Sequence, residues 1–96
     1  MRKSYFVYII TNYNNTVFYT GMTDDLKERI YQHKIGIVRN SFSKRYRLYK
    51  LVWFEEFRDP QETIIIEKKV KDMRREKKLE LIRKKNPKLK DLFTLR

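Results

Sequence analysis

The sequence predicts a small α+β protein in which a three-stranded antiparallel sheet is flanked by helices. Strand-like apolar runs alternate with stretches of helical spacing in the order β-β-α-β-α-α, and turn-forming asparagines separate the first two runs. With 96 residues, 15% aromatic side chains and only 2 Gly and 2 Pro, the chain suits one packed core and has little linker character. We therefore expect a single domain over residues 1–96.

The N-terminal part of the chain predicts a β-hairpin. Residues 5–11 are rich in β-branched and aromatic side chains at both odd and even positions, which indicates a strand buried on both faces. Residues 12–15, Asn-Tyr-Asn-Asn, are typical of a turn, and residues 17–22 predict the second strand. If residues 12–15 form the entire loop, Tyr8 lies directly opposite Tyr19 and both phenols share one face of the sheet.

The next segment predicts a helix with polar residues beside its apolar stripe. It begins with acidic residues that suit a helix start, and Leu26 and Ile30 form the stripe. Arg29 and His33 are four residues apart and are therefore neighbours on the helix surface. They fall along the edge of the stripe, where a side chain is half-buried and still reaches a ligand. We expect this helix to end near Gly36.

The rest of the chain predicts one more strand and further helices. Residues 37–46 indicate a polar, basic connection, and residues 48–57 a third strand. Pro60 fits the first turn of a new helix. The helical spacing slips between residues 74 and 77, which predicts either two helices or one that bends there. We expect residues 89–93 to pack as a last short helical turn.

The charge balance favours nucleic acid as the partner. Lys and Arg number 24 against 12 acidic residues, giving a net charge of +12. This excess costs self-repulsion unless a polyanion neutralises it. A membrane role is disfavoured, because no wide apolar face backs the basic tract and no segment is long enough for a signal peptide or membrane span. With no cysteine and one histidine, thiolate zinc and multi-histidine sites are excluded, and we expect a cytoplasmic protein.

Five polar side chains are candidates for a site: Tyr8, Tyr19, Arg29, His33 and Glu67. Each has an ordinary structural interpretation, the tyrosines as strand aromatics, Arg29 and His33 as a solvated helix face, and Glu67 as the ion-pair partner of a nearby lysine. Together they suit phosphodiester hydrolysis with one metal ion. That reaction needs an activated water, charge relief on the phosphoryl oxygens and help for the leaving alkoxide.

Two tyrosine motifs are followed by an arginine, a histidine and a glutamate: Phe6-Val7-Tyr8, Tyr19-Thr20-Gly21, Arg29, His33 and Glu67. At these residues the chain resembles the GIY-YIG nuclease superfamily, and in particular the small stand-alone proteins related to the N-terminal nuclease domain of the excinuclease. The resemblance covers nearly the whole chain. The motifs depart from the family pattern in having Phe6 and Val7 for glycine and isoleucine, Thr20 for isoleucine, and Met22 where some relatives carry a lysine.

The resemblance implies a GIY-YIG-like fold and a metal-dependent DNA endonuclease. Glu67 would hold one Mg²⁺ or Mn²⁺, ions that take oxygen ligands and keep most of their waters. Arg29 would bind a non-bridging phosphate oxygen with its always-charged fork. Tyr8 is our choice for activating water, Tyr19 for orienting water or phosphate, and His33 for supporting proton transfer, although the resemblance does not settle which tyrosine acts. A free phenol titrates near about 10, so the role of Tyr8 needs a nearby cation or a metal-bound hydroxide.

A basic surface is expected to follow the phosphate backbone of DNA without reading its sequence. Its candidate residues are Lys44, Arg45, Lys71, Arg74, Arg75 and Lys78. The alternative is a solvated helix surface with mixed salt bridges, but cations outnumber anions there. Asn86 is the candidate for the family's asparagine. We expect structured or single-stranded DNA as the substrate, with DNA repair or processing as the setting.

Two other functions stay open. The same fold could bind branched or damaged DNA without cutting it, and binding would then persist with no cleavage in any metal. A basic partner of the ribosome or of another RNA assembly is the second alternative; RNA would then outcompete DNA, and Arg29 would matter no more than any surface cation. The sequence does not specify the oligomeric state, the shape of the substrate, or whether a partner protein selects the target.

Overall fold

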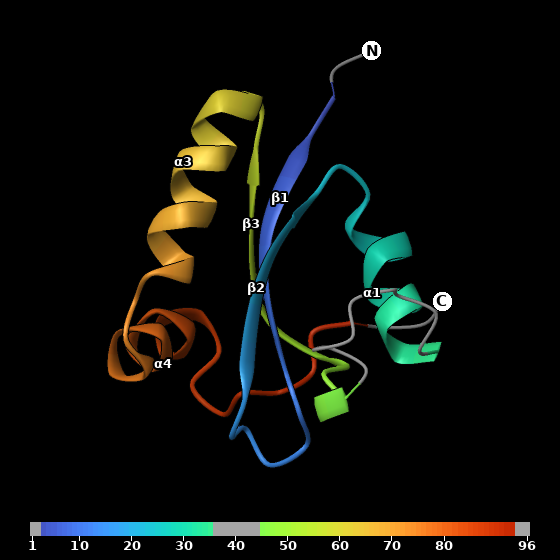
Figure 1. The fold of residues 1–96 in the computed structure, drawn as a ribbon, viewed down its shortest axis with the longest axis vertical. Helices are drawn as coiled ribbons and strands as arrows, with labels where there is room; N and C mark the ends of the chain where they lie inside the picture. The colour runs from blue at the N-terminus through green and yellow to red at the C-terminus, as the bar shows by residue number, and fades with distance from the viewer. Residues whose placement is uncertain (1–2, 36–44, 94–96) are drawn as a thin grey trace.

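The protein folds as a three-stranded antiparallel sheet with helices on both sides (Figure 1). The computed structural model describes residues 3–35 and 45–93. Its elements are β1 (Tyr5–Thr11), β2 (Phe18–Thr23), α1 (Leu26–Ile35), β3 (Lys50–Phe57), α3 (Pro60–Lys71) and α4 (Arg75–Lys85). This confirms the predicted fold class and element order. The expected helix end at Gly36 and most of the basic connection after it lie outside the described residues.

The central strand separates two hydrophobic clusters. The strand order is β2-β1-β3, so β1 has a neighbour on each edge. Val7 and Ile9 pack with residues of α3 and α4, whereas Tyr8 and Ile10 pack with Ile30 of α1. Figure 1 accordingly shows α3 and α4 on one side of the sheet and α1 on the other. The two-sided burial predicted for residues 5–11 is confirmed.

The register of the hairpin differs from the prediction by two residues. Tyr8 pairs with Gly21 rather than with Tyr19. The cause is Asn12, whose Oδ1 accepts hydrogen bonds from the backbone nitrogens of residues 16 and 17, at 2.8 and 3.2 Å, and so keeps both residues in the loop. Because a shift of two residues preserves the face, Tyr19 still lies on the same side of the sheet as Tyr8.

The two C-terminal helices follow from local sequence signals. Asp59 caps α3, and its Oδ1 accepts a hydrogen bond from the Gln61 nitrogen at 3.1 Å. Pro60 occupies the first turn, as predicted. The slip in helical spacing marks a true break at residues 72–74, between α3 and α4. Among the described residues, no helix combines the length and the apolar character needed to cross a membrane.

The predicted last helical turn is wrong, because the segment after α4 is bonded to β3 instead. The Asn86 side-chain nitrogen donates to the Val52 carbonyl at 3.0 Å and to the Lys90 carbonyl at 2.8 Å. Further along, the Leu92 nitrogen donates to the Leu51 carbonyl at 2.7 Å. Backbone and side-chain bonds to β3 thus hold this segment in a non-helical path.

Candidate active site

Tyr8 lies in the middle of the sheet, on the face covered by α1, with only 2% of its surface exposed. Its ring extends across β2 at Gly21, its cross-strand partner. A Cβ atom at Gly21 would lie 2.4 Å from the Tyr8 hydroxyl oxygen and 2.5 Å from Cζ, far inside contact distance. Gly21 therefore makes the space that the ring occupies. The sequence analysis assigned no role to Gly21. The signal that could have indicated one is that the chain contains only two glycines, and one of them lies inside a predicted strand.

His33 joins the two tyrosines. Its Nε2 lies 3.2 Å from the Tyr8 hydroxyl oxygen, within hydrogen-bond distance. The imidazole centroid is 5.9 Å from that of the Tyr8 ring and 6.2 Å from that of Tyr19. Two phenols from neighbouring strands thus flank one buried imidazole, even though the strands do not place them directly opposite each other.

The start of α1 fixes the position of Arg29. The Asp25 side chain accepts a hydrogen bond from the Glu28 nitrogen at 3.2 Å, and the Asp25 carbonyl accepts one from the Arg29 nitrogen at 3.0 Å. Arg29 is half-buried and lies one turn before His33. Its charge acts on the titration of both Tyr8 and His33. The predicted half-buried position is confirmed for Arg29, whereas His33 lies deeper than predicted, with only 6% of its surface exposed.

Glu67 reaches the same region from the opposite layer. It lies on α3, which packs mainly against β2, an edge strand of the sheet. Only 16% of the Glu67 side chain is exposed, and its carboxylate accepts a charged hydrogen bond from the Lys71 ammonium at 3.2 Å. Its charge nevertheless acts on the pKa of the Tyr8 phenol. Glu67 is therefore electrostatically coupled to Tyr8, although α3 belongs to the other layer.

Burial dominates the electrostatics of the site. Burial first, and then the neighbouring Tyr19 phenol, raise the pKa of Tyr8 above its ordinary value, while Arg29 opposes the rise and Glu67 adds to it. Burial, and then the charge of Arg29, lower the pKa of His33 to about 4. At neutral pH the phenol is therefore protonated and the imidazole is neutral. A neutral imidazole beside a protonated phenol is a pair that can pass a proton.

The family model for the GIY-YIG catalytic domain matches residues 4–80. The chain belongs to the GIY-YIG family. The GIY-YIG chain is also similar to the solution structure of a UPF0213 protein from Bacillus halodurans, with 28% identity, 96% of each chain covered and a TM-score of 0.58. No curated protein matches it. The resemblance noted in the sequence is therefore confirmed, and the family is a nuclease superfamily.

The matched range of the GIY-YIG model contains the five candidate residues and ends before Asn86. Asn86 is buried, and its side chain is bonded to the backbone of β3 and of the C-terminal segment. The described hydrogen bonds of Asn86 therefore hold the chain together and include none to the candidate residues.

The donor set of this GIY-YIG protein suits a divalent ion held largely by water and substrate. No group of three or more His, Cys, Asp or Glu side chains forms a metal site within residues 3–35 and 45–93. Mg²⁺ is commonly bound by one or two carboxylates together with water and substrate phosphates. Glu67 supplies one carboxylate, and an ion bound directly to it would take the place of the Lys71 ammonium.

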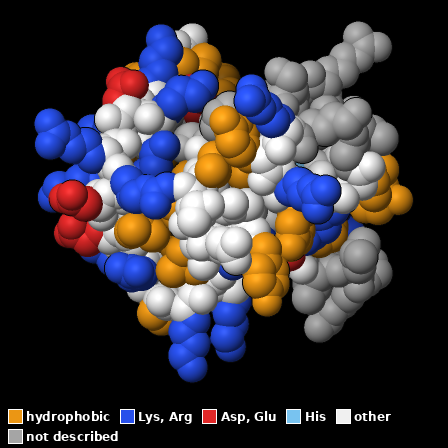
Figure 2. All heavy atoms as spheres, turned by 60° about the horizontal axis from the view of Figure 1, so that its bottom comes forward, with side chains coloured by type: hydrophobic (Ala, Val, Ile, Leu, Met, Phe, Trp, Pro, Cys, Tyr) orange, Lys and Arg blue, Asp and Glu red, His pale blue; other side chains and the backbone are white. Residues whose placement is uncertain are grey.

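The predicted nucleic-acid-binding residues lie in two separate regions. Arg45 is exposed, with its guanidinium 5.6 Å from the Tyr46 ring, and Lys44 lies outside the described residues. The other four fall at the C-terminal end of α3 and the first turns of α4: Lys71, Arg74, Arg75 and Lys78. Figure 2, in which the bottom of Figure 1 comes forward, shows many Lys and Arg side chains on this face and few acidic ones.

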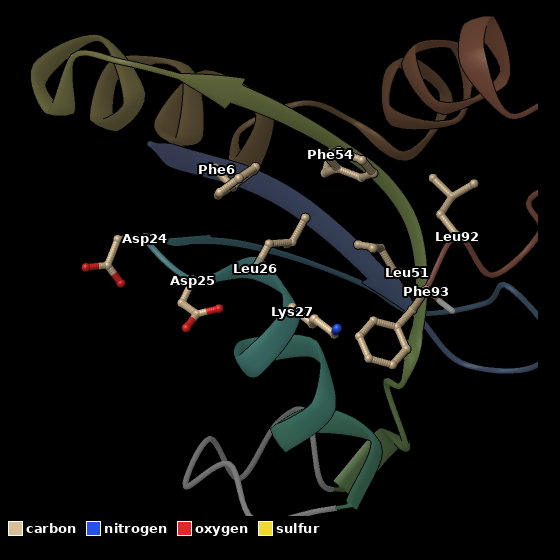
Figure 3. A pocket seen from close by; sticks show the side chains of 9 residues that line it. All are labelled: Phe6, Asp24, Asp25, Leu26, Lys27, Leu51, Phe54, Leu92 and Phe93. Atoms are coloured by element: carbon tan, nitrogen blue, oxygen red, sulfur yellow. The ribbon is translucent and has the colours of Figure 1, made fainter. Parts of the chain in front are cut away.

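A separate hollow of about 370 Å³ opens between α1 and β3 (Figure 3). Its lining is mostly apolar, with Phe6, Phe54 and Phe93 among its residues, and two aspartates stand near its edge. Its lining includes none of the five candidate residues. This mostly apolar hollow is therefore distinct from the cluster of candidate residues.

Proposed function

We propose that this protein is a metal-dependent DNA endonuclease, acting in DNA repair or processing in the cytoplasm. The observation that carries the proposal is the surroundings of the Tyr8 phenol, which is bonded to His33 and lies within electrostatic reach of Arg29 and Glu67. The phenol comes from β1, the imidazole and the guanidinium from α1, and the carboxylate that acts on its pKa from α3. Packing of the core alone does not require polar groups from three elements to act on one buried phenol. The net charge of +12 supports a polyanionic substrate.

The side chains divide the chemistry among them. Arg29 binds a non-bridging oxygen of the scissile phosphate and offsets the charge that develops on it. Tyr8 takes the proton of the attacking water as it passes its own proton to the neutral His33, so that no free tyrosinate forms. Burial disfavours the imidazolium that results, and the negative charge of the bound phosphate offsets that cost. Tyr19 orients the water or the phosphate from the other side of the imidazole.

Glu67 is the proposed ligand of Mg²⁺ or Mn²⁺. When bound, such an ion supplies charge stabilisation at the phosphate and at the departing oxygen. The low exposure of the Glu67 side chain restricts its motion, and a substrate phosphate would complete the ion's surroundings.

The test is a nicking assay on single-stranded and branched DNA with Mg²⁺ or Mn²⁺. We expect metal-dependent cleavage that Glu67→Ala and Tyr8→Phe each reduce by at least about a hundredfold, the usual scale for a general base or charge-stabilising group. Glu76→Ala, which removes an exposed carboxylate from α4, is the matched control and should leave cleavage unchanged. Cleavage that persists in Glu67→Ala would contradict the proposal.

A second candidate is a DNA-binding module that does not cut. The ion pair between Glu67 and Lys71 favours it, because that pair already satisfies the carboxylate. For such a module, the wild-type protein binds structured DNA, no divalent metal supports cleavage, and Glu67→Ala binds DNA as tightly as the wild type or more tightly. The same assay therefore separates the two functions.

A further inference from the structure

Another hollow, with both polar and apolar lining residues, lies where the start of β2 meets the start of α4. Its volume is about 240 Å³. Its lining combines an apolar floor with two cations and one hydroxyl: Val17, Phe18 and Met73, then Arg75 and Lys78, then Thr16. A low-dielectric floor strengthens any ion pair formed above it.

The two cations of this hollow have no acidic partner among the described residues. Within those ranges, no salt bridge involves Arg75 or Lys78. The Arg75 guanidinium lies 5.6 Å from the centroid of the Phe18 ring. Such stacking holds a guanidinium still while the edges of the group keep their N–H donors for a planar or tetrahedral anion.

Lys78 experiences an excess of positive charge. Burial first, and then the ammonium of Lys71, lower the pKa of Lys78, and Asp72 offsets only part of the effect. The folded protein thus places a lysine where its charge is disfavoured. An anion in the hollow would reverse that balance.

The start of α4 adds to the positive potential. Arg75 is the first residue of this helix of 11 residues, and Arg74 at the N-cap position provides no side-chain hydrogen bond. Backbone N–H groups at a helix start that lack a capping partner favour anions. On the opposite wall, the Thr16 hydroxyl accepts a hydrogen bond from Asn12 at 2.7 Å and keeps its own proton to donate.

Lys71 connects this hollow to the candidate active site. Its ammonium is bonded to Glu67 on one side and acts on Lys78 on the other. The hollow also contains Phe18, which packs on the α3 and α4 side of β2, whereas its neighbour Tyr19 packs on the α1 side. A polyanion that contacts both the hollow and the tyrosines would therefore cross the edge strand β2.

We propose that the hollow formed by Thr16, Arg75 and Lys78 is a subsite for a backbone phosphate of the DNA strand that flanks the scissile phosphate. The inference rests on the proposed function, because a position can flank the scissile phosphate only if the protein cuts DNA. The cations and the hydroxyl bind the phosphate oxygens, and the apolar floor of Val17, Phe18 and Met73 contacts the attached deoxyribose. A phosphodiester contacts both the polar residues and the apolar residues of the hollow, whereas inorganic phosphate contacts only the polar ones.

The test is a binding measurement in EDTA, so that no cleavage occurs. Fluorescence anisotropy with a labelled single-stranded oligonucleotide is recorded over a range of salt for the wild type, Lys78→Met and Lys84→Met. Lys84 is an exposed cation on the same helix that does not line the hollow. Lys78→Met should weaken binding about tenfold and reduce the slope of log affinity against log salt by about 0.7. Lys84→Met should change both much less.

Methylphosphonate substitution then locates the contact. One phosphate at a time is made neutral along the oligonucleotide, and affinity is measured for the wild type and Lys78→Met. We expect a single flanking position whose neutralisation weakens binding to the wild type but not to Lys78→Met. Additive effects at every position, or equal losses for the two lysine variants, would overturn the proposal.

Two controls keep the outcome interpretable. Lys78→Met should unfold at the same or a higher temperature than the wild type, because it removes a charge that burial disfavours. A weaker-binding variant with unchanged stability therefore reports on the contact. The methylphosphonate experiment is also independent of cleavage. If the protein never cuts DNA but one phosphate position depends on Lys78, the result supports this subsite and contradicts the endonuclease. If the protein cuts DNA but no phosphate position depends on Lys78, the result contradicts only the subsite.

Discussion

The Tyr8 ring occupies the space that a side chain at residue 21 would need, and Gly21 leaves that space open. Gly21 has no positive φ, so its backbone conformation does not require glycine. What requires it is the phenol ring, which fills the volume of the missing Cβ. The glycine of the second motif is thus explained by packing rather than by a turn, and it determines where the Tyr8 hydroxyl lies.

We expect Gly21→Ala to lower the free energy of unfolding by about 1–3 kcal/mol and to impair cleavage, because the new methyl group displaces the Tyr8 ring. Urea unfolding measures the first effect. In a Tyr8→Leu background the atoms that clash are absent, so the same substitution should cost much less there. Equal costs in both backgrounds would show that the ring does not fill this space.

His33 should titrate far below an ordinary histidine. Its pKa of about 4 in the folded protein lies below the value of 6.5 for the unfolded chain, so the unfolded state binds more protons between these values. Stability is therefore full above about pH 6.5 and is lost as the pH falls toward 4, by on the order of 2 kcal/mol at pH 5. Urea unfolding of the wild type and of His33→Gln at pH 7.5 and pH 5 gives the difference.

Nuclear magnetic resonance provides a direct check of this prediction. The chain contains one histidine, so the imidazole signal needs no assignment by mutation. A midpoint near 6.5 would contradict the burial of the His33 ring between the two tyrosines.

At the scale of elements, the hairpin shows what local sequence signals can and cannot predict. The apolar pattern of residues 5–11 and 17–22 predicted both strands, and the assumed four-residue turn placed both phenols on one face. The register was off by two residues, because it depends on the hydrogen bonds of the Asn12 side chain to the loop backbone. Such side-chain-to-backbone bonds depend on a single rotamer, which no periodicity records.

Glu67 shows a second limit of the sequence. The sequence predicted an ion pair with a nearby lysine as its ordinary interpretation, and the side chain is 16% exposed and pairs with Lys71. The pattern did not predict that α3 covers the face opposite α1, or that the charge of Glu67 acts on the pKa of Tyr8 from the opposite layer. Which layer a helix joins depends on the order of the strands, and helical spacing contains no information about that order.

Asn86 joins the end of α4 to β3, and we expect its removal to act on stability. Asn86→Ala leaves the Val52 and Lys90 backbone groups without their side-chain partner, at a cost of about 2–3 kcal/mol in the free energy of unfolding. Urea unfolding measures this cost, with Asn14→Ala in the exposed loop as the control.

The same variant distinguishes a structural role from a catalytic one. If Asn86 acts only through the fold, the folded fraction of Asn86→Ala cleaves DNA at the wild-type rate at low temperature. Lost cleavage with unchanged stability would instead place Asn86 in the chemistry, as the family resemblance first implied.

At the scale of the whole molecule, the sheet divides the proposed tasks between its two faces. The face under α1 contains the tyrosines and the histidine, while α3 and α4 on the other face provide the carboxylate and most of the predicted phosphate contacts. The edge strand β2 lies where the two sets meet. The composition predicted a polyanionic partner, but it did not predict that α3 and α4, which carry most of the cations expected to bind DNA, cover the face opposite α1.

The order of these parts along the chain bears on when the protein becomes active. A nascent chain that has left the ribosome only as far as residue 59 already contains Tyr8, Tyr19, Arg29 and His33, yet it lacks Glu67 and the helix that carries it. The same holds for a proteolytic fragment cut before Pro60. Under the proposed function, neither species could cleave DNA, because both lack the metal ligand Glu67.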